Sequence, residues 1–187
     1  MTRGGLIRTG LWLLGGLMLG GIIHIVAVIL VPDFTTDDAW TRLATFGPDA
    51  QFNVLPAVEP GAEPLPMLDP SMAHAVCRFT LDDGPVRLDA TIPDTFWSFS
   101  LFNRRGETTY SFNDRTSGEG KLAMLVLTSS QLSMLRENPP DDLDSLIVIE
   151  TEDDHVFALL RAFVPDKRRE KAIDAALGRA KCAQEKV

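Results

Sequence analysis

An uncharged apolar run, Gly10 to Val31, constrains this chain more than any other feature of its sequence. At about 1.5 Å of rise per residue, a helix of this length spans roughly 30 Å, the thickness of the hydrocarbon core of a bilayer. We therefore predict a transmembrane anchor over residues 9–32, preceded by a short tail of residues 1–8. A cleaved signal peptide is the alternative interpretation, but its apolar core is shorter, and no Ala-x-Ala cleavage site follows this run.

The charges beside the run predict an orientation. Arg3 and Arg8 precede it without an acidic residue, whereas Asp33, Asp37 and Asp38 follow it. Short basic flanks remain in the cytoplasm. We therefore expect a single-pass protein with a cytoplasmic N-terminus and its main domain on the far side of the membrane.

Small residues recur inside the run at helical spacing. Gly16 and Gly20 lie four residues apart, which lets two helix backbones approach closely in lipid, and His24 continues the same stripe. Glycine is also common in membrane helices that have no such role. The stripe Gly16, Gly20 and His24 therefore indicates either packing against a second membrane helix or only a membrane span.

The charge balance of the chain excludes one class of partner. With 26 acidic and 18 basic residues, the formal net charge is −8. Proteins that bind nucleic acid neutralise phosphates with clustered lysine and arginine. We expect no nucleic-acid partner.

We predict that residues 33–69 connect the anchor to the domain. The segment 38–46 is amphipathic, and we predict a short helix there with Thr36 or Asp37 as its N-cap. The proline-rich part that follows is either a stalk or irregular chain packed on the domain, and its many apolar residues favour packing. A short helical turn is predicted over residues 70–75, with proline first.

From residue 70 to residue 187 the pattern predicts one α+β domain. Short apolar or alternating runs separated by turn residues indicate strands. Two segments, 131–137 and 167–181, have the period and caps of helices. We predict a mainly antiparallel sheet with a few peripheral helices, one of them C-terminal. The predicted strands are 76–81, 86–91, 96–102, 108–112, 121–128, 144–151 and 155–164, the last two forming a hairpin.

The two cysteines, Cys77 and Cys182, lie 105 residues apart. Outside the cytoplasm they are able to form a disulfide, which would close a long loop and contribute about 2–4 kcal/mol. The alternative is two unpaired thiols. The sequence has no cluster of cysteines and histidines at the spacing of a metal site, since His24, His74 and His155 are scattered, so we expect no metal or cofactor.

A search for catalytic residues finds none. The sequence has no GxSxG turn for a nucleophile. Four carboxylates in predicted loops are candidates for an acid–base pair, but acidic residues are also common in solvated turns. These are Asp82, Asp83, Asp114 and Glu119. A pocket on the sheet is a second candidate, lined by Trp97 or Tyr110 with Asn103 and Arg105.

One stretch resembles a known family. Between residues 84 and 103 the sequence reads Gly84-Pro85-Val86-Arg87-Leu88, then Pro93, then Phe96-Trp97-Ser98-Phe99-Ser100-Leu101-Phe102-Asn103. It resembles the domain of unknown function 1254, and the match covers about residues 70–165. The layout looks like the short, membrane-anchored alphaproteobacterial type. The resemblance implies a bacterial inner-membrane protein with a periplasmic domain, working beside a protein that carries the domain of unknown function 1214. Long members have an Asn-x-Asp-Thr-type segment where this chain reads residues 70–77, so no site is carried over there.

Two functions remain as hypotheses. The leading one is a non-enzymatic interaction or assembly module of the cell envelope, held by its anchor beside a second membrane protein. The alternative is a periplasmic ligand-binding or hydrolytic domain that acts on an envelope carbohydrate or lipid. The first predicts a stable membrane partner, and the second predicts a ligand or an activity in residues 33–187.

Overall fold

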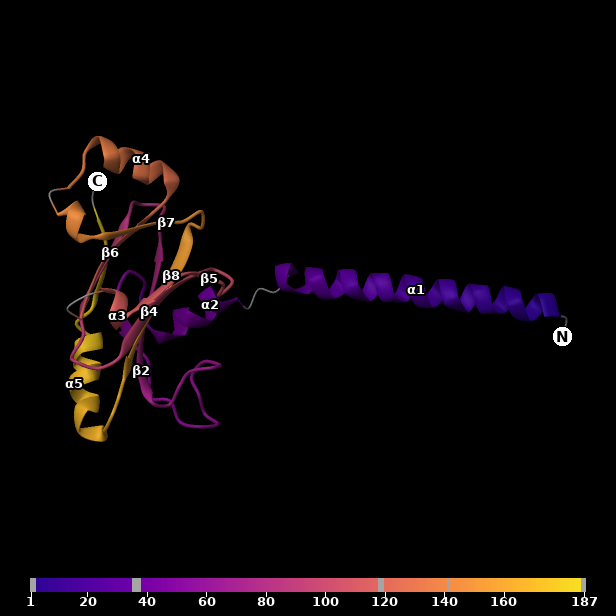
Figure 1. Cartoon of the computed structure of the whole chain (residues 1–187), viewed down its shortest axis with the longest axis horizontal. Coiled ribbons are helices and arrows are strands. Elements are labelled where there is room, and N and C mark those ends of the chain that lie inside the picture. Colours follow the sequence, from indigo (N-terminus) through magenta and orange to yellow (C-terminus); the bar gives the residue numbers. More distant parts are fainter. Residues whose placement is uncertain (1–2, 35–37, 118–119, 141, 186–187) are drawn as a thin grey trace. The chain divides into compact units, whose positions relative to one another are not determined.

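The computed structural model describes residues 3–34, 38–117, 120–140 and 142–185, and the chain divides into two compact units, Met1–Asp37 and Asp38–Val187. The first unit contains one helix, α1 (Arg3–Phe34) (Figure 1). Its apolar part, Ile7–Leu30, has 24 residues and is long enough to cross a bilayer, although a signal sequence would have the same character. Helix α1 is therefore a candidate membrane span.

The second unit contains two β-sheets. In the described part of the chain every strand pairing is antiparallel except that of β6 with β7. The five-stranded sheet has the order β1 (Asn53–Val54), β2 (Met72–Thr80), β8 (His155–Phe163), β4 (Trp97–Asn103), β5 (Thr108–Asn113). The four-stranded sheet has the order β7 (Ile147–Glu150), β6 (Lys121–Leu127), β3 (Val86–Thr91), β9 (Lys181–Gln184).

Short helices lie around these sheets, and α4 and α5 are at opposite ends of the unit (Figure 1). Helix α4 begins at a capping box, in which Thr128 and Gln131 each bond the other's backbone, and α5 begins at the side chain of Asp166. The arrangement confirms the predicted α+β class with a C-terminal helix. The helices are α2 (Ala39–Leu43), η1 (Ala44–Phe46), α3 (Asp114–Ser117), α4 (Ser129–Glu137), η2 (Leu143–Ser145) and α5 (Lys167–Leu177).

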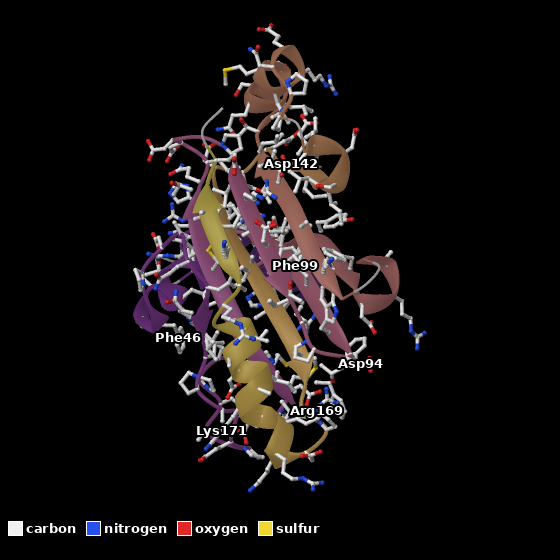
Figure 2. All side chains as sticks on the ribbon, turned by 90° about the vertical axis from the view of Figure 1, so that its left-hand side faces the viewer. Phe46, Asp94, Phe99, Asp142, Arg169 and Lys171 are labelled. Carbon is white, nitrogen blue, oxygen red and sulfur yellow. A yellow bond between two sulfur atoms is a disulfide. The ribbon has the colours of Figure 1, made fainter. Side chains whose placement is uncertain are left out.

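Alternation along the strands places the main core between the two sheets. Phe99 of β4 and Leu88 of β3 have no exposed surface, and both belong to one buried cluster with residues of both sheets (Figure 2). Helix α5 contributes Ile173 and Leu177 to the same cluster. Burial of these side chains is the main stabilisation of the fold.

A second apolar cluster covers the outer face of the five-stranded sheet. Trp40 and Leu43 of α2 pack on this face, and Leu65 and Leu68 of the proline-rich connection pack against the same cluster. Arg78 holds the helix in place. Its Nη1 donates to the carbonyl oxygen of Trp40 (3.0 Å), and its guanidinium lies 4.7 Å from the centre of the Trp40 ring.

The predicted hairpin of the last two strands is wrong. Strand β7 pairs with β6 in the four-stranded sheet, whereas β8 lies between β2 and β4 in the other sheet. The residues between them therefore cross from one sheet to the other. Strand β7 has apolar side chains on both faces, because Ile147 packs on the main core and Val148 packs beneath α4. Apolar side chains on both faces are typical of a strand that is covered on both sides, and a hairpin strand with one solvated face alternates instead.

Three element boundaries also differ from prediction. The expected helical turn at 70–75 is absent from the described chain, because β2 already begins at Met72 and pairs with β8. The last helix ends at Leu177, and Lys181–Gln184 pairs with β3 as β9. The N-cap of α2 is Asp38, whose carboxylate accepts from the backbone of Thr41. The expected caps, Thr36 and Asp37, lie outside the described residues.

Candidate functional site

Cys77 and Cys182 form a disulfide in this structure. Cys77 lies on β2 and Cys182 on β9, so the bond joins the two sheets through the core. Their Cα atoms are 6.5 Å apart, and neither residue is more than 4% exposed. The bond closes a loop of 105 residues and ties the last strand to the first long one.

The membrane-helix candidates Gly16, Gly20 and His24 all lie on α1. A Cβ atom added at Gly16 or Gly20 would meet no heavy atom within 4 Å. Substitution by a larger residue therefore meets no obstacle inside the described chain. Whether this stripe packs on a second helix stays a prediction.

The structure does not bring together the residues of the predicted sheet pocket. Trp97 is 1% exposed and packs edge-on against Phe112, inside the core, because odd residues of β4 point between the sheets. Tyr110 also packs on this core. None of the described cavities is lined by Trp97, Tyr110, Asn103 or Arg105.

Asn103 and Arg105 instead shape the turn between β4 and β5. The Asn103 Nδ2 donates to Glu107 (2.6 Å), and its Oδ1 accepts from the backbone N–H groups of Arg105 (3.1 Å) and Glu107 (3.0 Å). The Arg105 guanidinium is exposed and lies 3.4 Å from Glu107. These contacts use the side-chain amide of Asn103 to hold the turn in place.

The structure describes three of the four carboxylate candidates. Asp82 and Asp83 are exposed in the turn after β2, and Asp114 begins α3. Glu119 lies outside the described residues. Within the described ranges, no three histidine, cysteine or acidic residues lie close enough to hold a metal ion.

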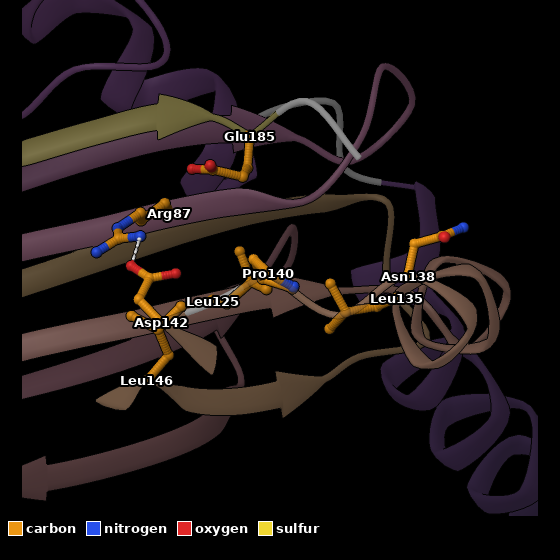
Figure 3. A pocket seen from close by; sticks show the side chains of 8 residues that line it. All are labelled: Arg87, Leu125, Leu135, Asn138, Pro140, Asp142, Leu146 and Glu185. Carbon is orange, nitrogen blue, oxygen red and sulfur yellow. Dashed lines mark hydrogen bonds and ion pairs between the residues drawn. The ribbon is translucent and has the colours of Figure 1, made fainter. Parts of the chain in front are cut away.

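A partly open pocket of about 220 Å³ lies on the outer side of the four-stranded sheet (Figure 3). It is formed by β3, β6 and the segment that runs from α4 to β7. Its lining combines an apolar floor with charged groups at the rim. The lining residues are Arg87, Leu125, Leu135, Asn138, Pro140, Asp142, Leu146 and Glu185.

The apolar floor results from the packing of α4 on the sheet. Leu125 of β6 and Leu135 of α4 are 1% and 2% exposed, and both belong to a small buried cluster. Helix α4 is held at its start by Gln131, whose Nε2 donates to the carbonyl oxygen of Leu81 (2.6 Å). The helix ends before Pro139 and Pro140, so the chain turns away there, and the partly exposed Pro140 and Leu146 complete the apolar lining.

The rim of the pocket carries fixed charges. Arg87 donates through Nη1 to Asp142 (2.6 Å) and through Nε to Asp89 (2.9 Å), so its guanidinium is held by two carboxylates. The hydrogen bond with Asp142, followed by that with Asp89, raises the pKa of Arg87, and the same bond from Arg87 lowers the pKa of Asp142. Glu185 adds a further carboxylate. This pocket is suited to hold an apolar side chain that is flanked by polar or basic groups.

Sequence reasoning did not find this pocket. Asp142 lies 55 residues from Arg87, and Glu185 lies beyond both, so no local pattern relates them. The signal in the sequence is the pair Pro139–Pro140, which predicts that the chain breaks after the helix. This pair of prolines does not predict which leucines line the pocket.

The architecture of this chain is that of an α+β domain with two sheets, which follows an apolar N-terminal helix in the sequence. The profile of the family described as Protein of unknown function (DUF1254) matches residues 50–183, which is most of that domain. The chain belongs to this family. No curated protein matches it in sequence.

A solved structure with a TM-score above 0.5 shares the fold at low identity. The crystal structure of the VPA0106 protein from Vibrio parahaemolyticus is similar, with a TM-score of 0.58 and 14% identity over 77% of this chain. An uncharacterized protein from Burkholderia cenocepacia has a TM-score of 0.46 and 13% identity over 81% of this chain. The chain covers 32% of the first protein and 44% of the second, so it corresponds to only part of either.

Proposed function

We propose that this protein is a membrane-anchored module of the bacterial cell envelope, which docks a segment of a second membrane protein in the pocket over the four-stranded sheet. The observation that carries the proposal is the pocket itself, in which the partly exposed Pro140 and Leu146 lie with the buried Leu125 and Leu135 inside a charged rim. Binding hot spots are typically apolar pockets of this kind, surrounded by polar groups. The family resemblance makes a protein with the domain of unknown function 1214 the first partner to test.

The disulfide supports a location outside the cytoplasm. Disulfides persist in oxidising compartments and are rare in the cytosol. The bond between Cys77 and Cys182 lies in the core of the domain, so the domain folds around an oxidised pair. Together with α1 as a retained anchor and with the basic flank of Arg3 and Arg8, this favours a periplasmic domain on the inner membrane with a cytoplasmic N-terminus.

Site-specific photo-crosslinking in the native host tests the docking surface. A photoreactive residue at Asn138, on the pocket rim, is expected to capture one membrane protein. The same residue at Thr108, exposed on β5 of the other sheet, is the matched control and is expected to capture none. Equal capture at both positions, or a full-length protein that purifies alone from mild detergent, would refute the proposal.

Two sets of variants separate the contributions of the pocket and the anchor. Leu146→Asp places a charge in the apolar lining of the pocket and is expected to reduce recovery of the partner about tenfold, which corresponds to the loss of one apolar contact. The pair Gly16→Ile and Gly20→Ile tests helix pairing, since neither position is obstructed within the described chain. Loss of the partner in the glycine variants alone would assign docking to the membrane helix.

A ligand-binding function is the second candidate. It is favoured by a separate groove beside α5, which contains a buried histidine with an unpaired nitrogen. An envelope carbohydrate or lipid remains a substrate class for this candidate. The chemistry of the groove itself points to a narrower class of ligand.

A further inference from the structure

A cavity of about 420 Å³ lies between α5 and the chain that leaves β1, at the opposite end of the domain from the pocket over the four-stranded sheet. One wall is apolar and is formed by Leu55, Pro56 and Val58. The other wall is α5, which contributes Glu170 and Asp174. The volume lies within the range of sites that bind small ligands.

The two carboxylates on α5 lie one turn apart and form no ion pair within the described part of the chain. Glu170 and Asp174 are both half-buried, and no ion pair joins either of them to a basic group among the described residues. Burial, followed by the negative charge of Glu170, raises the pKa of Asp174. A cation placed between these carboxylates would relieve their repulsion.

The basic residues of α5 do not neutralise this pair. Arg169 donates instead to the carbonyl oxygen of Asp94, and Figure 2 shows its side chain near that loop. Arg168 lies 3.5 Å from Asp166, the N-cap. Lys167 also lines the cavity, but its side chain is exposed and forms no ion pair with Glu170 or Asp174 among the described residues.

His74 provides a second, independent feature of the same cavity. It lines the cavity, is only 2% exposed, and its Nε2 has no hydrogen-bond partner. A buried polar atom without a partner is rare in a native fold, so its missing partner requires an explanation. His74 therefore points to a ligand that hydrogen-bonds there.

The surroundings of His74 make it an acceptor. Burial, followed by the positive charge of Arg161 on the neighbouring strand, lowers the pKa of His74 to about 4, although Asp69 and a hydrogen bond with the backbone of Met72 act in the opposite direction. The ring is therefore neutral at pH 7. A neutral imidazole that donates one hydrogen bond to a backbone carbonyl has its other nitrogen free to accept.

We propose that this cavity binds the primary ammonium group of an aliphatic amine, with Glu170 and Asp174 as counter-charges, His74 as a neutral acceptor, and Leu55, Pro56 and Val58 around the carbon chain. An ammonium group has three donors, which match two carboxylates and one imidazole nitrogen. A metal ion does not fit as well, because the described residues contain no group of three suitable ligands. The amine belongs either to a free diamine or to a lysine side chain of a partner.

Calorimetry on the full-length protein in detergent tests the proposal, with 1,5-diaminopentane as the probe. We expect saturable binding, and we expect none with 1,5-pentanediol, which has the same length but no charge. Glu170→Gln and Asp174→Asn should each weaken binding about tenfold, as expected for the loss of one charged hydrogen bond. Asp144→Asn is the control, because Asp144 is exposed on η2 and does not line the cavity.

The ring nitrogen of His74 gives a readout that is independent of affinity. Its ¹⁵N resonance should move when the diamine binds to the wild-type protein and should not move with the diol. Calorimetry with Nα-acetyl-lysine amide distinguishes the two sources of the amine. Tighter binding of this compound than of the diamine indicates a lysine side chain, and tighter binding of the diamine indicates a free amine. Binding that is equal for diol and diamine, or unchanged in Glu170→Gln and Asp174→Asn, would overturn the proposal.

Discussion

Cys77 and Cys182 connect the central part of one sheet to the edge strand of the other, with their Cα atoms 6.5 Å apart in the core. Cys77 faces Ala158 of β8, and Cys182 faces Leu88 of β3. The bond therefore joins the two sheets inside the buried core, where it is shielded from solvent. Strand β9 pairs with β3 over only four residues, so the disulfide is its strongest attachment.

Removal of the disulfide is expected to destabilise the domain. Cys77→Ala combined with Cys182→Ala should lower the free energy of unfolding by about 2–5 kcal/mol, because the unfolded chain regains the freedom of a 105-residue loop. Denaturant unfolding of the full-length protein in detergent measures this change. Cys77→Ala alone should cost about as much as the double substitution, and an unchanged unfolding midpoint would contradict the prediction.

His74 should make the stability depend on pH. Its pKa in the folded protein is about 4, below its ordinary value of 6.5, so the unfolded chain binds the proton first. The free energy of unfolding should therefore fall as the pH falls from 6.5 to 4, by roughly 2–3 kcal/mol from this residue. Unfolding at several pH values should show a smaller slope in His74→Gln than in the wild-type protein. An NMR titration that places the pKa of His74 near 6.5 would be inconsistent with this burial.

Phe99 should be among the most sensitive positions of the core. It has no exposed surface and packs on Phe112 with ring centres 5.4 Å apart, between the two sheets. Phe99→Ala should cost about 3–5 kcal/mol, because it leaves a cavity that close-packed neighbours cannot fill. Phe96→Ala is the matched control, since Phe96 is 46% exposed, and it should cost far less. Equal losses at the two positions in thermal unfolding would argue against this core.

Asp38 should stabilise the attachment of α2 through its charge. Burial raises the pKa of this carboxyl, but hydrogen bonds from Thr41 and Arg104 outweigh that effect and lower it to about 2. Asp38→Ala should therefore cost about 1 kcal/mol at pH 7, as for other lost N-caps. Asp38→Asn keeps a capping oxygen and should cost less.

The same carboxyl predicts a difference at low pH. Because the folded pKa of Asp38 is below its ordinary value of 3.8, its contribution is complete above that value and is lost as the pH falls toward 2. The difference in stability between wild type and Asp38→Ala should therefore shrink in acid. A difference that is constant from pH 7 to pH 2 would show that the charge plays no part.

Whether the mature protein retains α1 shows whether this helix is a membrane anchor or a cleaved signal sequence. We expect the intact mass of the protein extracted from membranes to include Arg3 and the whole of Ile7–Leu30, because no cleavage motif follows that stretch. The protein should also stay in the membrane fraction after alkaline washing. A mature protein that begins after residue 31 would identify a signal sequence.

Local features of the fold follow from the sequence alone. The predicted strand 86–91 coincides with β3, and the capped helix predicted up to Glu137 coincides with α4 within two residues. Both depend on neighbouring residues, namely alternation in β3 and the capping residue Thr128 in α4. Predictions were wrong where a local pattern fits two structures. The predicted last helix ran on to Lys181, whereas α5 ends at Leu177 and Lys181–Gln184 pairs with β3 as a strand.

The sequence by itself determined the apolar N-terminal helix, the α+β class and the membership of the family, because hydrophobic periodicity and short motifs encode them within a few tens of residues. It also named Cys77 and Cys182 as a pair, although it left open whether they are joined. Only the tertiary structure decided that the strands form two sheets. It alone placed Arg87 beside Asp142 and His74 beside α5. The physical reason is that cavities and ion pairs arise from contacts between residues far apart in the chain, which no local pattern specifies.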